Sequence, residues 1–323
     1  MTCTTTTTHR RAVIDVGTNS VKLLVADVNG RQVVPVVELS EQTRLGNGFF
    51  ETNQLQPAAI AMTAKAVAHF AASARATGVS LPRIIATSAA RDALNQGELT
   101  QAIKEATGLK LEIISGDQEA DWVFKGVTNV PGLENAPLLL LDVGGGSTEF
   151  IVGRGTQKHF RESFQLGAVR LMEKIPVSDP PGPGQLTECR NWVRDFLKLE
   201  VLPRMGPPLA AERTAAPASQ PLELIGTGGT ATILARMEAQ LDDYDRERIE
   251  ATRLTRDRVR WQVEALWSVP LAERKRFVGL PKKRADIILY GSVIYEVLME
   301  LLGFAELRIS TRGLRFAAVM DEG

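Results

Sequence analysis

Two stretches of this chain match each other position by position, and this repeat constrains the fold more than any other feature. One runs from Ala12 to Val28 and reads AVIDVGTNSVKLLVADV; the other runs from Leu138 to Gly153 and reads LLLLDVGGGSTEFIVG. Each has an apolar run, an aspartate, a glycine-containing turn and a second apolar run, which is typical of two strands joined by a tight turn. Asp15 aligns with Asp142. Such a repeat predicts two related domains that each begin with the same hairpin.

The turn of the second stretch carries groups suited to a phosphate and its accompanying cation. Glycines allow backbone N–H groups to approach an anion closely, hydroxyls add donors, and carboxylates bind a hard cation. The residues concerned are Asp142, Gly144, Gly145, Gly146, Ser147, Thr148 and Glu149. A single glycine turn more often only joins two strands. The repeat favours a phosphate-binding site over a simple turn. Ser20 aligns with Ser147, and two unrelated turns would not be expected to share an aspartate, a glycine and a serine at the same spacing.

Composition indicates an ordinary globular protein. The chain has 323 residues, 44% of them hydrophobic and 24% charged, which is enough for two domains with a substantial core. Apolar stretches are too short to cross a bilayer, and the start lacks a signal-peptide pattern, so we expect a cytoplasmic protein without a membrane partner. The 38 basic and 38 acidic residues argue against nucleic-acid binding. The two cysteines do not have metal-ligand spacing.

The first half alternates strand and helix patterns after a threonine-rich tail. We expect residues 1–11 to be disordered, a helix over Pro57 to Thr77, and a strand that feeds a helix bearing Arg91. Arg91 would lie near an anion at that helix start or pair with an acidic neighbour, and the sequence favours neither. Another strand feeds a helix capped by Ser115 or Asp117, with Glu119 in its first turn.

A first-turn glutamate usually only complements the helix dipole. Glu119 gains interest because its strand should deliver it to the same sheet edge as Asp15, and sites in alternating strand and helix folds collect at the carboxyl ends of strands.

The second half adds a third glycine turn and a basic cluster. Leu222 to Met237 predicts a strand, a turn and a helix, and the amides of Gly228 and Gly229 could contact phosphate, although a tight turn alone would look the same. Pro207 to Pro221 reads as an exposed, poorly ordered connector. Basic residues at 256, 258, 260, 274–276 and 282–284 usually form a solvated face, but could form a track for a polyanion.

Together these elements resemble the exopolyphosphatase and guanosine pentaphosphate phosphohydrolase (Ppx/GppA) family, within the superfamily of actin, sugar kinases and the Hsp70 ATPase domain. The matching motifs include IDVGTNSVKLLVADV, ATSAARDALN, IISGDQEADWVFKGV, LLDVGGGSTEF, IGTGGTATILA and STRGLRFAAV, in the family's order. The resemblance implies an α/β fold with two ribonuclease-H-like (actin-like ATPase) domains flanking a cleft. It divides the chain into 12–127 with a C-terminal helix at about 310–323, and 128–309. It also implies the short form, without the further C-terminal helical domain of larger relatives.

The resemblance also assigns roles to individual residues. Glu119 falls at the family's catalytic glutamate, expected to activate the attacking water. Asp142 and Glu149, with Asp15, fall at positions implicated in binding a metal, expected to be Mg²⁺ or another divalent cation. Positions that match phosphate contacts are Asn19, Arg91, Gly144, Gly145, Gly146 and Ser147, to which the residue patterns above add Ser20, Gly228 and Gly229. Gln118 stands where the family commonly has a second acidic residue.

The function expected from this resemblance is exopolyphosphatase activity, the hydrolysis of the terminal phosphoanhydride of inorganic polyphosphate. Guanosine pentaphosphate (pppGpp) is the alternative substrate, and would need a base pocket that the turn at Gly226 could help to form. Two other classes stay open: a nucleotide-binding kinase or ATPase-like regulator, and a weakly catalytic polyphosphate-binding protein. The resemblance further suggests a homodimer.

Overall fold

The computed structural model describes residues 8–130 and 132–321, and divides the chain into two units. The first unit extends to Asn129 and takes up the chain again from Leu314 onward, while the second unit comprises Val130–Gly313. The sequence-based boundaries were 127/128 and about 310, so the structure moves each by a few residues. No described helix is long and apolar enough to span a membrane.

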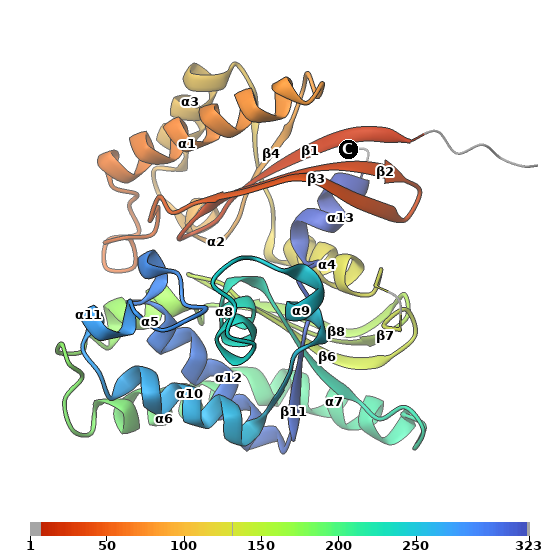
Figure 1. The fold of residues 1–323 in the computed structure, drawn as a ribbon, viewed down its shortest axis with the longest axis vertical. Coiled ribbons are helices and arrows are strands. Elements are labelled where there is room, and N and C mark those ends of the chain that lie inside the picture. The colour runs from red at the N-terminus through yellow and green to blue at the C-terminus, as the bar shows by residue number, and fades with distance from the viewer. Residues whose placement is uncertain (1–7, 131, 322–323) are drawn as a thin grey trace, which may run out of the picture. The chain divides into compact units, whose positions relative to one another are not determined.

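The first unit is a five-stranded sheet with helices on both faces. Its strands lie in the order β3-β2-β1-β4-β5, with β2 antiparallel to β1 and β3, and with β1, β4 and β5 parallel. Helices α1 and α3 pack together, as do α4 and α13 (Figure 1). The elements are β1 (His9–Val16), β2 (Val21–Asn29), β3 (Gln32–Glu41), α1 (Pro57–Ala76), β4 (Arg83–Ala86), α2 (Ser88–Asp92), α3 (Gln96–Thr107), β5 (Leu111–Ile113), α4 (Gly116–Val127) and α13 (Leu314–Met320).

The second unit repeats this plan with a larger sheet, in the order β10-β11-β9-β6-β7-β8. Its strands are β6 (Pro137–Val143), β7 (Thr148–Arg154), β8 (Gln157–Phe164), β9 (Glu223–Thr227), β10 (Arg253–Thr255) and β11 (Glu306–Ile309). Its helices are α5 (Ala168–Lys174), α6 (Gln185–Phe196), η1 (Leu197–Val201), α7 (Leu202–Ala215), α8 (Gly228–Glu238), α9 (Arg246–Ala251), α10 (Arg256–Trp267), α11 (Leu271–Arg274), η2 (Lys282–Arg284) and α12 (Ile288–Leu302).

The repeat seen in the sequence is present in the strand pairing. The last pair of the first hairpin is Val16 with Val21, and that of the second hairpin is Val143 with Thr148. The two residues of the second pair each lie 127 positions after the corresponding residue of the first pair (143 − 16 = 127 and 148 − 21 = 127), so the two hairpins have the same turn length. Each hairpin's first strand also pairs in parallel with a strand that leads into a helix, β4 before α2 and β9 before α8.

The prediction of a disordered tail over 1–11 is wrong at its end. Strand β1 begins at His9, because β2 extends far enough to pair with it: His9 lies opposite Val28. Arg10 adds a two-pronged ion pair to Asp27, with both N···O distances below 3 Å (2.8 and 2.9 Å). The rest of the predicted tail, residues 1–7, lies outside the described residues.

The prediction of a poorly ordered connector over Pro207 to Pro221 is also wrong for most of its length. Helix α7 runs through Pro207 and Pro208 to Ala215. Leu209 is buried in the core of the second unit, and the buried carboxylate of Glu212 accepts a hydrogen bond from Arg154 at 2.8 Å. Burial of this face outweighs the cost of proline inside a helix, which composition alone could not reveal.

Replacing Leu209 with alanine tests this packing. We expect Leu209→Ala to lower the free energy of unfolding by about 2–5 kcal/mol, because it removes buried methyl groups and leaves a cavity. Leu199→Ala in the adjoining η1 is the control, since Leu199 is 73% exposed and should change stability by no more than about 0.5 kcal/mol. Urea unfolding followed by circular dichroism measures both. Equal effects of the two variants would contradict the placement of α7.

Candidate active site

The local fold of the first unit places Glu119 in the buried first turn of α4. Ser115 caps this helix, because its side-chain oxygen accepts a hydrogen bond from the backbone N–H of Gln118 at 3.1 Å. This decides between the two predicted caps in favour of Ser115. Glu119 lies one position further on and is only 7% exposed. A carboxylate buried to this extent needs polar partners.

Arg91 supplies such a partner. It lies at the end of the short helix α2, and its Nη1 donates to Oε2 of Glu119 at 2.9 Å and to the backbone oxygen of Ile114 at 3.3 Å. The sequence left open whether Arg91 meets an anion or an acidic neighbour. The acidic neighbour proves to be the predicted catalytic residue, so the two predicted site residues are in direct contact.

Asp15 lies one residue before the end of β1, beside β4, and is half-buried, with its Oδ1 buried. Its Oδ1 has no hydrogen-bond partner within the part of the chain that the structure describes. Burial raises the pKa of Asp15, while the positive charges of Lys22 and Arg315 oppose this rise. A buried oxygen that lacks a donor is suited to a cation or a proton, and this is the chemistry expected of a metal ligand.

The turn between β1 and β2 holds Asn19 and Ser20, both 5% exposed. The side-chain amide of Asn19 donates to Oγ of Ser20 at 3.4 Å and accepts from Nε2 of Gln42 at 3.1 Å. The following loop packs against this turn, since the N–H of Gly46 donates to the carbonyl of Thr18 at 2.7 Å. Both predicted phosphate contacts are therefore held by their neighbours.

In the second unit, the glycine turn after β6 has all three glycine carbonyls engaged on one side. The backbone N–H of Ala168 donates to Gly144 O at 3.0 Å, and the N–H groups of Val169 and Arg170 donate to Gly145 O at 2.8 and 3.1 Å. Nε of Arg170 donates to Gly146 O at 2.9 Å.

The direction of these carbonyls fixes the direction of the amides. In a trans peptide, the N–H points opposite to the C=O of the same peptide plane. The N–H groups of Gly145, Gly146 and Ser147 are therefore directed away from the start of α5. Successive amides directed to one side form a concavity suited to an anion such as phosphate.

The hydroxyl of Ser147 has a different role from the predicted phosphate contact. It donates to Oε1 of Glu149 at 2.9 Å, and the hydroxyl of Ser163 donates to the same oxygen at 2.7 Å. Glu149 is 2% exposed and lies opposite Asp142 in the β6–β7 pair. Ser147 thus fixes a carboxylate with its side chain, and its backbone amide remains the group suited to phosphate.

The third glycine turn lies directly against Asp142. Gly228 has φ of +81°, and a Cβ at this position would lie 2.1 Å from Oδ1 of Asp142. A Cβ on Gly229 would lie 3.7 Å from the guanidinium nitrogens of Arg284. The N–H groups at a helix N-terminus and a nearby guanidinium both attract anions, so this corner of the second unit is also suited to phosphate. Sequence reasoning assigned no individual role to Arg284.

The predicted metal ligands have the right donor type, although no three of them form a cluster. No group of three or more histidine, cysteine, aspartate or glutamate side chains among residues 8–130 and 132–321 could hold a metal ion. Magnesium usually takes only one or two protein carboxylates and completes its shell with water and substrate phosphates. Within the first unit the unpartnered oxygen of Asp15, and within the second unit the paired positions Asp142 and Glu149, each offer carboxylates of this kind.

The basic cluster differs from the predicted polyanion track. Arg258 pairs with Glu238 at 3.0 Å, and Arg260 lies 3.8 Å from Glu296. Arg274 is buried and pairs with Asp179 at 3.2 Å. Three of the expected arginines are thus engaged by carboxylates, while Arg284 lies near Gly229.

Comparison with known proteins identifies the family and the fold. The model of the Ppx/GppA phosphatase family matches residues 24–322. Exopolyphosphatase 2 of Mycobacterium tuberculosis is 31% identical over 318 residues, covering 93% of this chain and 94% of that protein. The solved structure of the Aquifex aeolicus Ppx/GppA family member is 27% identical with a TM-score of 0.76, covering 97% of both chains. An exopolyphosphatase from Cytophaga hutchinsonii is 25% identical with a TM-score of 0.83, covering 96% of both. The predicted two-domain, actin-like fold class is thereby confirmed.

Gly228→Ala tests the contact between the third turn and Asp142. We expect it to lower the free energy of unfolding by about 1–3 kcal/mol, because alanine is strained at this φ and its Cβ displaces the carboxylate. Gly97→Ala is the control: Gly97 lies in α3 with open space around it, and alanine favours helix there. Thermal unfolding compares the two. A Gly228→Ala protein as stable as the wild type would contradict this geometry.

Asp15→Asn tests the burial of an unpaired carboxylate. Because burial raises the pKa of Asp15, its contribution to stability is present at low pH and is lost as the pH rises through the folded-state pKa. At pH 7 in a chelator, the asparagine variant should therefore melt a few degrees above the wild type, and near pH 3 the difference should disappear. Calorimetry at both pH values checks this. A variant that melts below the wild type at pH 7 would show that the carboxylate is stabilised by its surroundings.

Proposed function

Because the chain belongs to the Ppx/GppA phosphatase family, we propose that it hydrolyses the terminal phosphoanhydride of inorganic polyphosphate and releases orthophosphate. The observation that carries this proposal is the direct contact between Arg91, the predicted phosphate-binding cation, and Glu119, the predicted base. The name of the Mycobacterium tuberculosis relative, exopolyphosphatase 2, supports polyphosphate as the substrate.

In the proposed reaction, the protein binds the phosphate chain and stabilises its negative charge, and it forms no covalent bond to the substrate. Phosphoryl transfer passes through a loose transition state whose charge spreads over the phosphoryl oxygens. In the second unit, the amides of Gly145, Gly146 and Ser147 would bind phosphoryl oxygens, and in the first unit the guanidinium of Arg91 would do so. Glu119 would accept a proton from the attacking water as its oxygen bonds to the terminal phosphorus, while the bond from that phosphorus to the bridging oxygen breaks and the shortened polyphosphate leaves with that oxygen. Bound magnesium would neutralise phosphate charge, with Asp15 in the first unit and Asp142 and Glu149 in the second unit as its predicted carboxylate ligands.

The ion pair gives Arg91 a second role. Its contact at 2.9 Å fixes the rotamer of the Glu119 carboxylate, and its bond to the carbonyl of Ile114 fixes the guanidinium itself. A base must lie within hydrogen-bond distance of the proton that it accepts, so restricting its rotamers favours the reactive geometry. Gln118 is half-buried in the same helix turn, and its amide side chain adds no charge beside this pair.

The proposal of polyphosphate as substrate rests on the names of the relatives more than on a basic track for a polyanion. Three arginines of the expected track, Arg258, Arg260 and Arg274, are paired with carboxylates. Guanosine pentaphosphate is the competing substrate, since the same terminal phosphate chemistry serves both. Mg²⁺ dependence, a cytoplasmic location and a homodimer stay predictions.

Glu119→Gln is the decisive variant. We expect turnover to fall about a hundredfold to ten-thousandfold, the usual contribution of general-base catalysis, while the melting temperature changes little. Glu98→Gln is the matched control, because Glu98 is an exposed glutamate in the first turn of α3 and should keep full activity. The measurement is orthophosphate release from long polyphosphate in Mg²⁺, repeated with EDTA.

The same assay with pppGpp and ATP decides the substrate. Release from polyphosphate that exceeds release from pppGpp supports the proposal. The reverse preference would replace polyphosphate with pppGpp, and turnover of ATP alone would assign the chain to the nucleotide-binding class. Polyphosphate binding without release would indicate a binding protein. Near-full activity of Glu119→Gln would remove Glu119 from the mechanism.

A further inference from the structure

Helix α12 lies beneath the two glycine turns of the second unit, and two of its residues face them. Gly291 packs so closely that a Cβ there would lie 2.6 Å from Oγ1 of Thr230, in the first turn of α8. One helical turn later, the hydroxyl of Tyr295 lies 3.4 Å from the carbonyl oxygen of Leu141 and 3.3 Å from that of Thr227. Tyr295 is fully buried.

These two carbonyls mark the place where the central strands separate. Strands β6 and β9 pair in parallel as far as Asp142 opposite Thr227. Beyond this pair, β6 leads into the turn of Gly144–Gly146 and β9 leads into α8 at Gly228. The Tyr295 hydroxyl contacts the carbonyl of Thr227, in the last pair, and that of Leu141, one residue before Asp142, so it joins the two strands near the end of their ladder.

The hydroxyl stays protonated and can therefore donate. Burial raises the pKa of Tyr295 well above its usual value, and the negative charge of Asp142 raises it further. Its one proton is shared between two carbonyl acceptors, and both carbonyls lose this donor if the hydroxyl is removed. Thr230 adds a second connection, because its Oγ1 donates to the carbonyl of Val143 at 3.3 Å.

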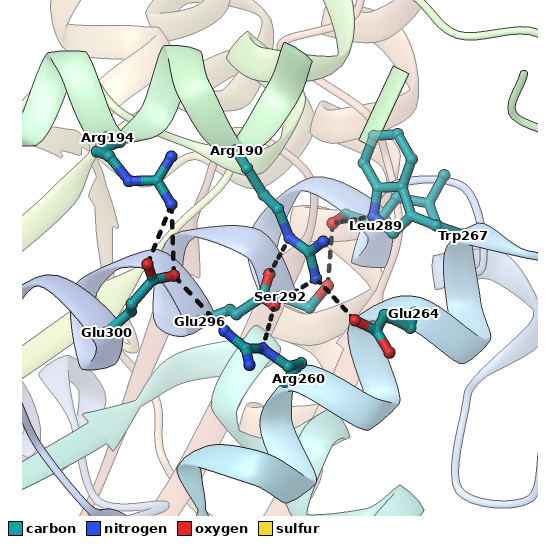
Figure 2. A network of polar contacts seen from close by, with 9 residues as sticks. All are labelled: Arg190, Arg194, Arg260, Glu264, Trp267, Leu289, Ser292, Glu296 and Glu300. Atoms are coloured by element: carbon teal, nitrogen blue, oxygen red, sulfur yellow. Dashed lines mark hydrogen bonds and ion pairs between the residues drawn. The ribbon is translucent and has the colours of Figure 1, made fainter. Parts of the chain in front are cut away.

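The other side of α12 is fixed by ion pairs, so the tyrosine projects from a rigid support. Figure 2 shows Glu296 and Glu300 of α12 between arginines of α6 and α10. Nε of Arg190 donates to Glu296 at 2.9 Å, and Arg194 donates to Glu300 at 3.3 Å. Glu296 is buried and also lies 3.8 Å from Arg260, so moving α12 would separate a buried carboxylate from two arginines, which makes displacement of α12 costly.

We propose that Tyr295 is a positioning residue of the phosphate site, whose hydroxyl sets the spacing between the Gly144–Ser147 turn and the N-terminus of α8. Its kinetic consequence depends on the proposed function. Asp142 lies between the two turns, against Gly228, so a change in this spacing also moves a predicted metal ligand. Errors of about 1 Å in such groups can reduce turnover a hundredfold.

The same helix offers a matched control. Tyr290 is also buried, and its hydroxyl donates to the carbonyl of Ile175 at 2.8 Å, at the end of α5 and away from both turns. Tyr290→Phe and Tyr295→Phe therefore each remove one buried hydroxyl from α12, but only Tyr295→Phe removes it from the place where β6 and β9 separate.

Hydrogen exchange measured by mass spectrometry is the first readout, because it does not depend on activity. In Tyr295→Phe, peptides covering 142–147 and 227–231 should exchange about tenfold faster than in the wild type. In Tyr290→Phe, those peptides should keep the wild-type rate. Unchanged exchange of both turns in Tyr295→Phe, or equal acceleration by the two variants, would overturn the proposal whether or not the chain hydrolyses polyphosphate.

Steady-state kinetics on long polyphosphate is the second readout. We expect Tyr295→Phe to lower kcat about tenfold while KM changes less than threefold, and Tyr290→Phe to stay within twofold in both constants. Faster exchange of the turns with an unchanged kcat would overturn the role in positioning. A wild-type protein inactive on polyphosphate would overturn the proposed function instead, and the exchange result would still decide the structural part.

Thr230→Val provides a second variant if Tyr295→Phe does not fold. It removes the hydroxyl that contacts Val143 while keeping the side-chain volume. The same two turns should exchange faster, by a smaller factor than in Tyr295→Phe, and kcat should fall about threefold. Wild-type exchange in this variant would overturn the proposal.

Discussion

The hydrogen bonds from the start of α5 to the glycine carbonyls decide what the central turn can bind. Because these carbonyls are engaged by Ala168, Val169 and Arg170, the amides on the other side of the same peptides are available together. Gly167 makes this possible, since a Cβ there would lie 2.3 Å from the carbonyl of Gly145. The proposed phosphate site has no positive side chain in its turn and thus depends on close approach of two backbone segments.

The first unit begins with the same hairpin and uses it differently. Both turns close with the same hydrogen bond, from Gly17 to Ser20 and from Gly144 to Ser147, each at 3.0 Å. In the first unit the middle of the turn carries Thr18 and Asn19, and a following loop packs against it. The catalytic candidates, Arg91 and Glu119, come from the helices after β4 and β5. The two units therefore share the same hairpin, while the residues in and around each turn differ and suit different roles.

Local patterns predicted what depends on short range. The two hairpins, the Ser115 cap and the helix over 57–76 follow from apolar spacing and turn residues near each other in the chain. Such local patterns could not predict contacts between elements that are distant in the sequence. The pairing of Arg91 with Glu119 and the closeness of Arg284 to Gly229 depend on how separate helices pack. The helix through Pro207 failed as a prediction for the same reason, because its support is burial against other segments.

The return of the chain to the first unit has a consequence for how the protein is made. Helix α13 packs against α4, which carries Glu119, and Arg315 donates to the carbonyl of Leu23 at 2.9 Å. Between these partners lies the whole second unit in the sequence. During synthesis the second unit can fold first, while the face of α4 that receives α13 stays uncovered until α13 itself has been made. The helix that bears the proposed base therefore reaches its native packing only after the second unit has been synthesised.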